Sequence, residues 1–338
     1  MTEPVQKSRI AYLDSLRGLA IVMVILAHYV APRFDYDGPG YVFSTFGGGG
    51  VLLFFILSGY LIYKTRQNID AVSFLSRRLW KLFPAYIGVC LVAIFLYYFT
   101  HKSLPSHREI ACNLTMTQDI FGERMFSNVF WTLLIELKFY FFMAIFGSLI
   151  CRLPSTAIVL FFFLLNCASF AYSGRGSNLL TFFPVFFIGV ALYRYQAAQW
   201  RKKEGLDFIV TLGFVCAGFL LFLVENKYSN TVFAAGLSMF SLYVLRAQWQ
   251  APALNGIGKI SYSLYLYHAA LGFFLFDWIK WQFGVNDWVS LAVVTPIVLL
   301  VSWLSYHYIE NPFVRWGKQM ETLHGSFNLA KTDPLKNK

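Results

Sequence analysis

Ten apolar runs, each long enough to cross a lipid bilayer as a helix, constrain the fold of this chain more than any other feature. The runs lie at about residues 16–31, 46–63, 84–100, 127–150, 155–173, 178–195, 207–225, 229–247, 259–276 and 287–309. Only 13% of the residues are charged, against about 25% in a soluble globular domain. The sequence therefore predicts an all-α, polytopic membrane helix bundle of about ten transmembrane helices.

Basic residues are unevenly divided between the two sides of such a bundle. With the N-terminus inside, the inner segments hold about three times as many Lys and Arg residues as the outer segments, as the positive-inside rule requires. We therefore expect both termini inside. The net charge of +11 is then explained by membrane orientation, so we do not expect nucleic acid as a partner. The basic N-terminus resembles a signal peptide, which we expect to be retained.

Three polar residues lie on one side of the first apolar run. In a regular α-helix Arg17 and His28 would lie within about 20° of each other and about 16 Å apart along the axis. Asp14 would lie within about 40° of the same stripe. Ionisable groups inside a membrane span are costly and are candidates for function. A packing role for His28, bonded to a neighbouring carbonyl or Tyr, stays open.

The fourth run contains a carboxylate, Glu136, at a depth similar to that expected for His28. A carboxylate there has to be neutral, paired or in a wet cavity. Lys138 is a poor partner, because residues two apart on a helix point away from each other. We therefore expect a partner on another helix, and His28 or Arg17 are available.

A basic motif, Arg77-Arg78-Leu79-Trp80-Lys81, precedes the third run on a predicted short helix that ends at Pro84. A positive-inside anchor with an aromatic belt residue is the simpler explanation. A phosphate-binding patch is the alternative, because the forked guanidinium group of Arg matches phosphate oxygens.

Polar residues also mark the last two runs. Ser261, Tyr265 and His268 share one helix face, where they could hydrogen-bond between helices or line a polar cavity. Glu310-Asn311-Pro312 closes the tenth run, and its proline predicts the end of that helix.

Glycine, proline and cysteine give further local predictions. The run Gly47–Gly50 predicts close backbone approach or a re-entrant start of the second span. Pro184 and Pro296 predict kinks. The five cysteines match no metal site and no disulfide pair expected outside, so we expect no metal.

Six motifs follow one another along the chain. They are Leu13-Asp14-Ser15-Leu16-Arg17-Gly18-Leu19-Ala20 followed by His28, Gly49-Gly50-Val51-Leu52-Leu53-Phe54-Phe55-Ile56-Leu57-Ser58-Gly59-Tyr60-Leu61, Arg78-Leu79-Trp80-Lys81 before Pro84, Trp131-Thr132-Leu133 with Glu136 and Phe139-Tyr140, Ser261-Tyr262-Ser263 with Tyr265 and His268, and Glu310-Asn311-Pro312. In this order they resemble the acyltransferase-3 family of integral-membrane acyltransferases over residues 8–316. We expect residues 317–338 to form a polar cytoplasmic tail.

This resemblance implies transfer of an acyl group, most commonly acetyl, from cytosolic acyl-coenzyme A. The acceptor would be a hydroxyl of a glycan on the outer side of a bacterial inner membrane, such as an exopolysaccharide or O-antigen. Catalysis would fall to His28 as general base, with Glu136 and Arg17. The coenzyme A phosphates would be held by Arg77, Arg78 and Lys81. Substrate or structural support would come from Asp14, Ser261, Tyr265 and His268.

Two departures from the family pattern bear on this interpretation. Lys81 stands where the family has a second Arg, which keeps the charge and loses a guanidinium fork. No hydrolase-like domain follows the last span, so we expect the membrane domain to act alone or to pass its acyl group to a separate protein. An acyl-enzyme intermediate on His28 or a serine stays open. A transporter or flippase for a glycan or acylated substrate is the alternative from another class.

Overall fold

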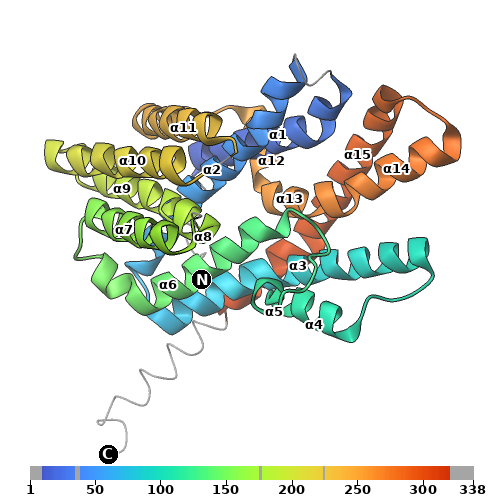
Figure 1. The fold of residues 1–338 in the computed structure, drawn as a ribbon, viewed down its shortest axis with the longest axis horizontal. Helices are drawn as coiled ribbons and strands as arrows, with labels where there is room; N and C mark the ends of the chain where they lie inside the picture. Colours follow the sequence, from blue (N-terminus) through green and yellow to red (C-terminus); the bar gives the residue numbers. More distant parts are fainter. Residues whose placement is uncertain (1–9, 35–38, 175–176, 224, 320–338) are drawn as a thin grey trace, which may run out of the picture. The chain divides into compact units, whose positions relative to one another are not determined.

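The computed structural model describes residues 10–34, 39–174, 177–223 and 225–319 (Figure 1). The described residues form helices joined by short connections, without any strand, so the predicted all-α fold class is confirmed. The chain divides into two compact units. The first unit combines Met1–Gln67 with Phe146–Tyr262, and the second combines Asn68–Ile145 with Ser263–Lys338. Each unit is therefore built from two stretches that are far apart in the sequence.

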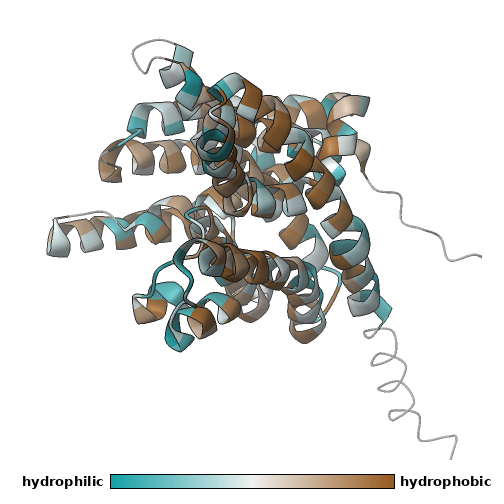
Figure 2. Cartoon of the chain, turned by 90° about the vertical axis from the view of Figure 1, so that its right-hand side faces the viewer, coloured by the Kyte–Doolittle hydropathy of each residue, from teal (hydrophilic) through white to brown (hydrophobic). Residues whose placement is uncertain are grey.

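Eight helical segments in the described part of the chain are long and apolar enough to cross a membrane. They are Ala11–Arg33, Pro39–Arg66, Ala71–His101, Phe130–Ile150, Ser155–Ser173, Asn178–Ala197, Lys202–Phe222 and Asp287–Gln319. Figure 2 shows that the helices are mostly apolar along their lengths, with polar residues more frequent at helix ends and connections. The polytopic bundle is thus confirmed, whereas its N-in, C-in orientation stays a prediction.

The remaining two of the ten predicted runs form helices of a different kind. The run at 229–247 forms α11 (Lys227–Ala247), which has sufficient length but also contains polar residues such as Asn230 and Ser238. The run at 259–276 is divided, because α12 (Pro252–Lys259), α13 (Ser261–Ala270) and α14 (Gly272–Phe283) follow one another with breaks at Ile260 and Leu271. A continuous span there is not formed.

The first unit is a set of helices that cross at glycine residues. Its helices are α1 (Ala11–Ile25), α2 (Pro39–Arg66), α7 (Ser155–Ser173), α8 (Asn178–Phe182), α9 (Val185–Ala197), α10 (Lys202–Phe222), α11 and α12. α10 packs beside α7, α9 and α11 (Figure 1). The helix breaks between α8 and α9 at Pro184, as expected. A Cβ atom on Gly59 of α2 would lie 1.8 Å from the carbonyl oxygen of Phe186, and one on Gly189 of α9 would lie 1.9 Å from that of Ile56. Small residues therefore let the backbones of α2 and α9 meet directly.

The second unit contains the helix that carries the basic motif. Its complete helices are α3 (Ala71–His101), α4 (His107–Thr115), α5 (Gln118–Phe121), α14 and α15 (Asp287–Ser305). It also contains most of α6 (Phe130–Ile150) and most of α13. Buried Tyr86 of α3 donates a hydrogen bond to the carbonyl oxygen of Asn113 at 2.8 Å, and Gln118 donates to the Tyr86 hydroxyl at 3.1 Å. These bonds fasten α4 and α5 to α3.

Two predicted helix ends are wrong. The basic motif does not form a separate helix ending at Pro84, because α3 begins at Ala71 and continues through Pro84 to His101. The helix of the tenth run does not end at Glu310-Asn311-Pro312 either. It passes through a π-helical turn, Tyr306–Glu310, and continues to Gln319. A π turn pairs residues five apart instead of four, and this wider turn precedes the proline. The predicted tail lies largely outside the described residues.

A second π-helical turn, Leu26–Val30, follows α1 and contains His28. The alignment of Arg17 with His28 calculated for a regular α-helix therefore applies only as far as Ile25. Turns of this kind occur often at functional sites. Both of them coincide with motif residues of this chain, His28 in the first and Glu310 in the second.

Candidate active site

The polar end of α1 carries an ion pair between a buried carboxylate and a half-buried guanidinium. The Arg17 guanidinium lies 4.0 Å from the Asp14 carboxylate, and the Asp14 side chain is 6% exposed. Asp14 is in the first turn of the helix, where a negative charge interacts favourably with the helix dipole. Arg17 thus pairs with Asp14 of its own helix, and its part in catalysis stays a prediction.

Helix α12 covers this end of α1. A Cβ atom on Gly258 would lie 1.9 Å from the carbonyl oxygen of Asp14, and one on Gly18 would lie 2.1 Å from that of Leu254. Ser15 donates a hydrogen bond to the side chain of Asn255 and accepts one from the amide of Ala251 at 2.9 Å. These contacts with α12 fix the part of α1 that carries Asp14 and Arg17. The spacing of residues on α1 alone did not predict this neighbour.

His28 is half-buried in its π-helical turn, next to the fully buried Tyr29. The glycine run of α2 lies close to the same stretch. A Cβ atom on Gly50 would lie 2.5 Å from the carbonyl oxygen of Ala20, and one on Gly47 would lie 3.0 Å from Cβ of Ala27. Because α2 is one continuous helix over Pro39–Arg66, the glycines serve close approach, and the re-entrant start is ruled out.

In the second unit, the Glu136 side chain is hydrogen-bonded to a residue of its own helix, α6. The Tyr140 hydroxyl, one turn further along α6, donates a hydrogen bond to Glu136 Oε1 at 2.7 Å. Lys138 instead pairs with Asp119, so the rejection of a Glu136–Lys138 pair is confirmed. Tyr140 belongs to the same motif as Glu136 but was not predicted to be its partner, although the spacing of four residues was a sufficient signal. The expected partner of Glu136 on another helix stays a prediction.

Arg78 of the basic motif also contacts Tyr140. The Arg78 guanidinium lies over two aromatic rings, 5.5 Å from the ring centre of Phe74 and 5.8 Å from that of Tyr140. Arg77 and Lys81 on α3 are half-buried. The motif is therefore more than an exposed anchor, because Arg78 lies among aromatic residues of α3 and α6.

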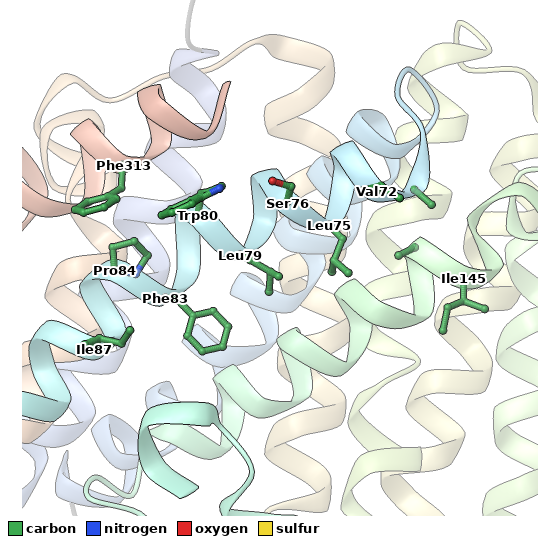
Figure 3. A pocket seen from close by; sticks show the side chains of 12 residues that line it. Val72, Leu75, Ser76, Leu79, Trp80, Phe83, Pro84, Ile87, Ile145 and Phe313 are labelled. Atoms are coloured by element: carbon green, nitrogen blue, oxygen red, sulfur yellow. The ribbon is translucent and has the colours of Figure 1, made fainter. Parts of the chain in front are cut away.

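An apolar groove of about 930 Å³ runs along α3 and α6 in the same unit. Figure 3 shows Leu75, Leu79 and Phe83 projecting from one side of α3, with Ile145 of α6 and Phe313 also at the groove. None of the three basic residues is part of its lining. A phosphate would be poorly solvated among apolar side chains, so the groove is a poor phosphate site.

The polar face of α13 takes part in hydrogen bonds between helices. The Tyr265 hydroxyl is hydrogen-bonded to that of Thr132 on α6 at 2.8 Å, and both residues are buried. Nδ1 of His268, which is fully buried, donates to the carbonyl oxygen of Tyr265 at 2.6 Å. A carbonyl oxygen only accepts, so this bond places the proton on Nδ1. Ser261 is also buried, and the bond between Tyr265 and Thr132 favours interhelical bonding over a polar cavity for Tyr265.

One buried acidic residue was misjudged from the sequence. Glu310, which is 6% exposed, accepts a hydrogen bond from Ser263 at 2.9 Å, and Ser263 also lies 3.4 Å from the hydroxyl of Ser305. The last two motifs thus meet in one cluster inside the second unit. A carboxylate within an apolar helix was the available signal.

The candidate residues belong to both units. Asp14, Arg17, His28 and Ser261 lie in the first unit, and the second contains Arg77, Arg78, Lys81, Glu136, Tyr265 and His268. The second unit brings together Arg78 with the Tyr140–Glu136 pair, and Tyr265 with Thr132 of the Glu136 helix. The first brings together Asp14 and Arg17.

The fold and these residues define a polytopic helical membrane protein with buried acidic and imidazole groups and half-buried basic groups in its helices. Over residues 10–307 the chain matches the family described as an acyltransferase domain. The chain therefore belongs to this family of acyltransferases, and the resemblance seen in its motifs is confirmed.

Curated relatives of this chain include proteins of Staphylococcus aureus. "Putative O-acetyltransferase SACOL0978" of strain COL is 27% identical over 361 residues, which cover 90% of this chain and 57% of the relative. "O-acetyltransferase OatA" of strain NCTC 8325 / PS 47 is 25% identical over 358 residues, with the same coverage of 90% and 57%. This chain thus spans little more than half the length of these relatives. No solved structure matches it significantly.

Proposed function

We propose that this protein is an O-acyltransferase that moves an acyl group, in the simplest case acetyl, from cytosolic acyl-coenzyme A to a hydroxyl of an extracytoplasmic glycan. The membrane would be the bacterial inner membrane, and a polysaccharide such as an exopolysaccharide or O-antigen is the proposed acceptor. Family membership and the name O-acetyltransferase of the relatives support the reaction class.

One observation carries the proposal beyond the family. The Arg78 guanidinium and the Glu136 carboxylate contact the same residue, Tyr140, inside an apolar unit. Charged groups are rare in such surroundings unless they serve binding or proton transfer. Arg78, together with Arg77 and Lys81, offers the positive charge that the phosphates of coenzyme A require.

The proposed chemistry uses His28 as general base. His28 takes the proton of the glycan hydroxyl while the hydroxyl oxygen attacks the thioester carbonyl carbon. The carbon–sulfur bond then breaks, and the leaving thiolate takes up the proton from the imidazolium. The products are the glycan ester and free coenzyme A. Glu136 is proposed as the essential carboxylate of the reaction, and Arg17 as a charge that supports the site with Asp14.

The test uses the purified full chain with radioactive acetyl-coenzyme A and an isolated polysaccharide acceptor. We expect label in the glycan, release of coenzyme A, and a loss of about 100-fold or more in His28→Ala, the range for removal of a general base. A His28→Ala variant with near-wild-type transfer would exclude the base role. Movement of glycan across vesicles without release of coenzyme A would favour a flippase instead.

The same label distinguishes direct transfer from an acyl-enzyme. When acceptor is withheld and the reaction is stopped rapidly, direct transfer leaves the protein unlabelled. Label on the protein would indicate an acyl-enzyme intermediate. Label that survives acid would fit an ester on a serine, and label that is lost in acid would fit an acyl-imidazole on His28.

A further inference from the structure

Tyr140 makes two contacts of different chemistry in the second unit. Its hydroxyl donates a hydrogen bond to Glu136 Oε1 at 2.7 Å, while the Arg78 guanidinium lies 5.8 Å from the centre of its ring. The Tyr140 side chain is itself buried, at 2% exposed. A fully packed ring has little freedom to move. The Glu136 carboxylate and the Arg78 guanidinium therefore both contact one rigid side chain.

We propose that Tyr140 is a positioning residue that holds Glu136 through its hydroxyl and Arg78 through its ring. The proposal rests on the proposed acyl transfer, in which Arg78 belongs to donor binding and Glu136 to the chemical step. One side chain then sets the geometry of both functions, and its two contacts can be removed separately.

The two contacts differ in what supports them. Arg78 has a second aromatic neighbour in Phe74, a fully buried residue whose ring centre lies 5.5 Å from the guanidinium. The contact between the Tyr140 ring and Arg78 is electrostatic attraction to the ring face, for which phenylalanine also suffices. The contact to Glu136 needs the hydroxyl, because it is the only hydrogen-bond donor of a tyrosine side chain.

The variants Tyr140→Phe and Tyr140→Leu separate these contacts. Tyr140→Phe keeps the ring, so we expect an unchanged KM for acetyl-coenzyme A and a kcat lowered by about 10- to 100-fold, the range for loss of a hydrogen bond to a charged group. Tyr140→Leu removes both contacts, so its KM should also rise by about 2- to 30-fold. Phe74→Leu should raise KM and leave kcat near the wild-type value.

Tyr86→Phe is the matched control. Tyr86 is a fully buried tyrosine of the same unit, and its hydroxyl donates to the carbonyl oxygen of Asn113 instead of to a candidate catalytic residue. Tyr86→Phe loses a buried hydrogen bond as Tyr140→Phe does, so we expect a comparable loss of thermal stability with unchanged kcat and KM.

The kinetic experiment distinguishes two kinds of failure. Absence of turnover by the wild-type chain would refute the proposed function itself. If the wild type is active, wild-type kcat in Tyr140→Phe would overturn the positioning role. An equal fall of kcat in Tyr140→Phe and Tyr86→Phe would overturn it as well, since it would indicate a general effect of buried-tyrosine loss.

Discussion

Asp70 shows how a single side chain sets the start of the helix that carries the basic motif. It is the N-cap of α3, and its carboxylate accepts hydrogen bonds from the amides of Val72 and Ser73, both at 3.0 Å. These bonds satisfy amides that have no partner within the helix. We expect Asp70→Ala to lower the free energy of unfolding by about 1 kcal/mol or less, since the residue is exposed. Thermal unfolding in detergent measures this, with Asp70→Asn as the variant that keeps the cap.

The same residue predicts a dependence of stability on pH. Hydrogen bonds from Ser73, first from its side chain and then from its amide, lower the pKa of Asp70 below its ordinary value of 3.8. A lowered pKa in the folded state means that its contribution is complete above 3.8 and is lost as the pH falls through the lowered value. The stability difference between wild type and Asp70→Asn should therefore decrease only below about pH 4. A difference that changes between pH 5 and pH 8 would contradict this assignment.

At the scale of helices, the first unit depends on backbone contacts at glycine. A methyl group on Gly189 would lie 1.9 Å from the carbonyl oxygen of Ile56 and 2.6 Å from the amide nitrogen of Tyr60. Backbone atoms cannot move aside as a side chain can, so α2 and α9 would have to separate. We expect Gly189→Ala to lower stability by about 1–3 kcal/mol, the cost of overpacking a core. Thermal unfolding of the purified protein would show this as a lower midpoint.

Gly213 of α10 provides the control for this substitution. A Cβ atom there meets nothing within 4 Å, and alanine is a better helix former than glycine by about 1 kcal/mol. Gly213→Ala should therefore be neutral or stabilising in the same assay. If the two variants lost stability equally, the direct contact of α2 with α9 would not be the cause.

At the scale of the whole molecule, the positive-inside distribution predicts which connections face the cytosol. Cys151, an exposed residue after α6, is expected inside, and Ser103, an exposed residue after α3, is expected outside. In right-side-out membrane vesicles, a membrane-impermeant maleimide should label a Ser103→Cys variant and leave Cys151 of the wild type unlabelled until the vesicles are opened. Labelling of Cys151 in sealed vesicles would reverse the proposed orientation. Cys112 is buried and should contribute little signal.

Local sequence pattern was sufficient for the helical fold class and for most of the spans. Apolar runs of sufficient length form helices in a membrane because backbone groups must bond within their own segment. The polar residues of the motifs could be recognised for the same reason, since Glu136 and His28 interrupt apolar runs. Helix ends were less predictable. Pro84 and Pro312 both lie inside continuous helices, although proline usually marks a boundary.

The partners of these residues depended on tertiary packing. Nothing along α6 indicates that Arg78 of α3 lies over Tyr140, and nothing along α2 indicates that Gly59 meets Phe186 of α9. Periodicity reports only the face on which a residue lies, because it reflects neighbours three or four positions away. Which faces meet is determined by how the surfaces of all helices fit together. The chain thus encodes its helices and its reactive residue types locally, while packing between distant segments brings Arg78, Tyr140 and Glu136 together.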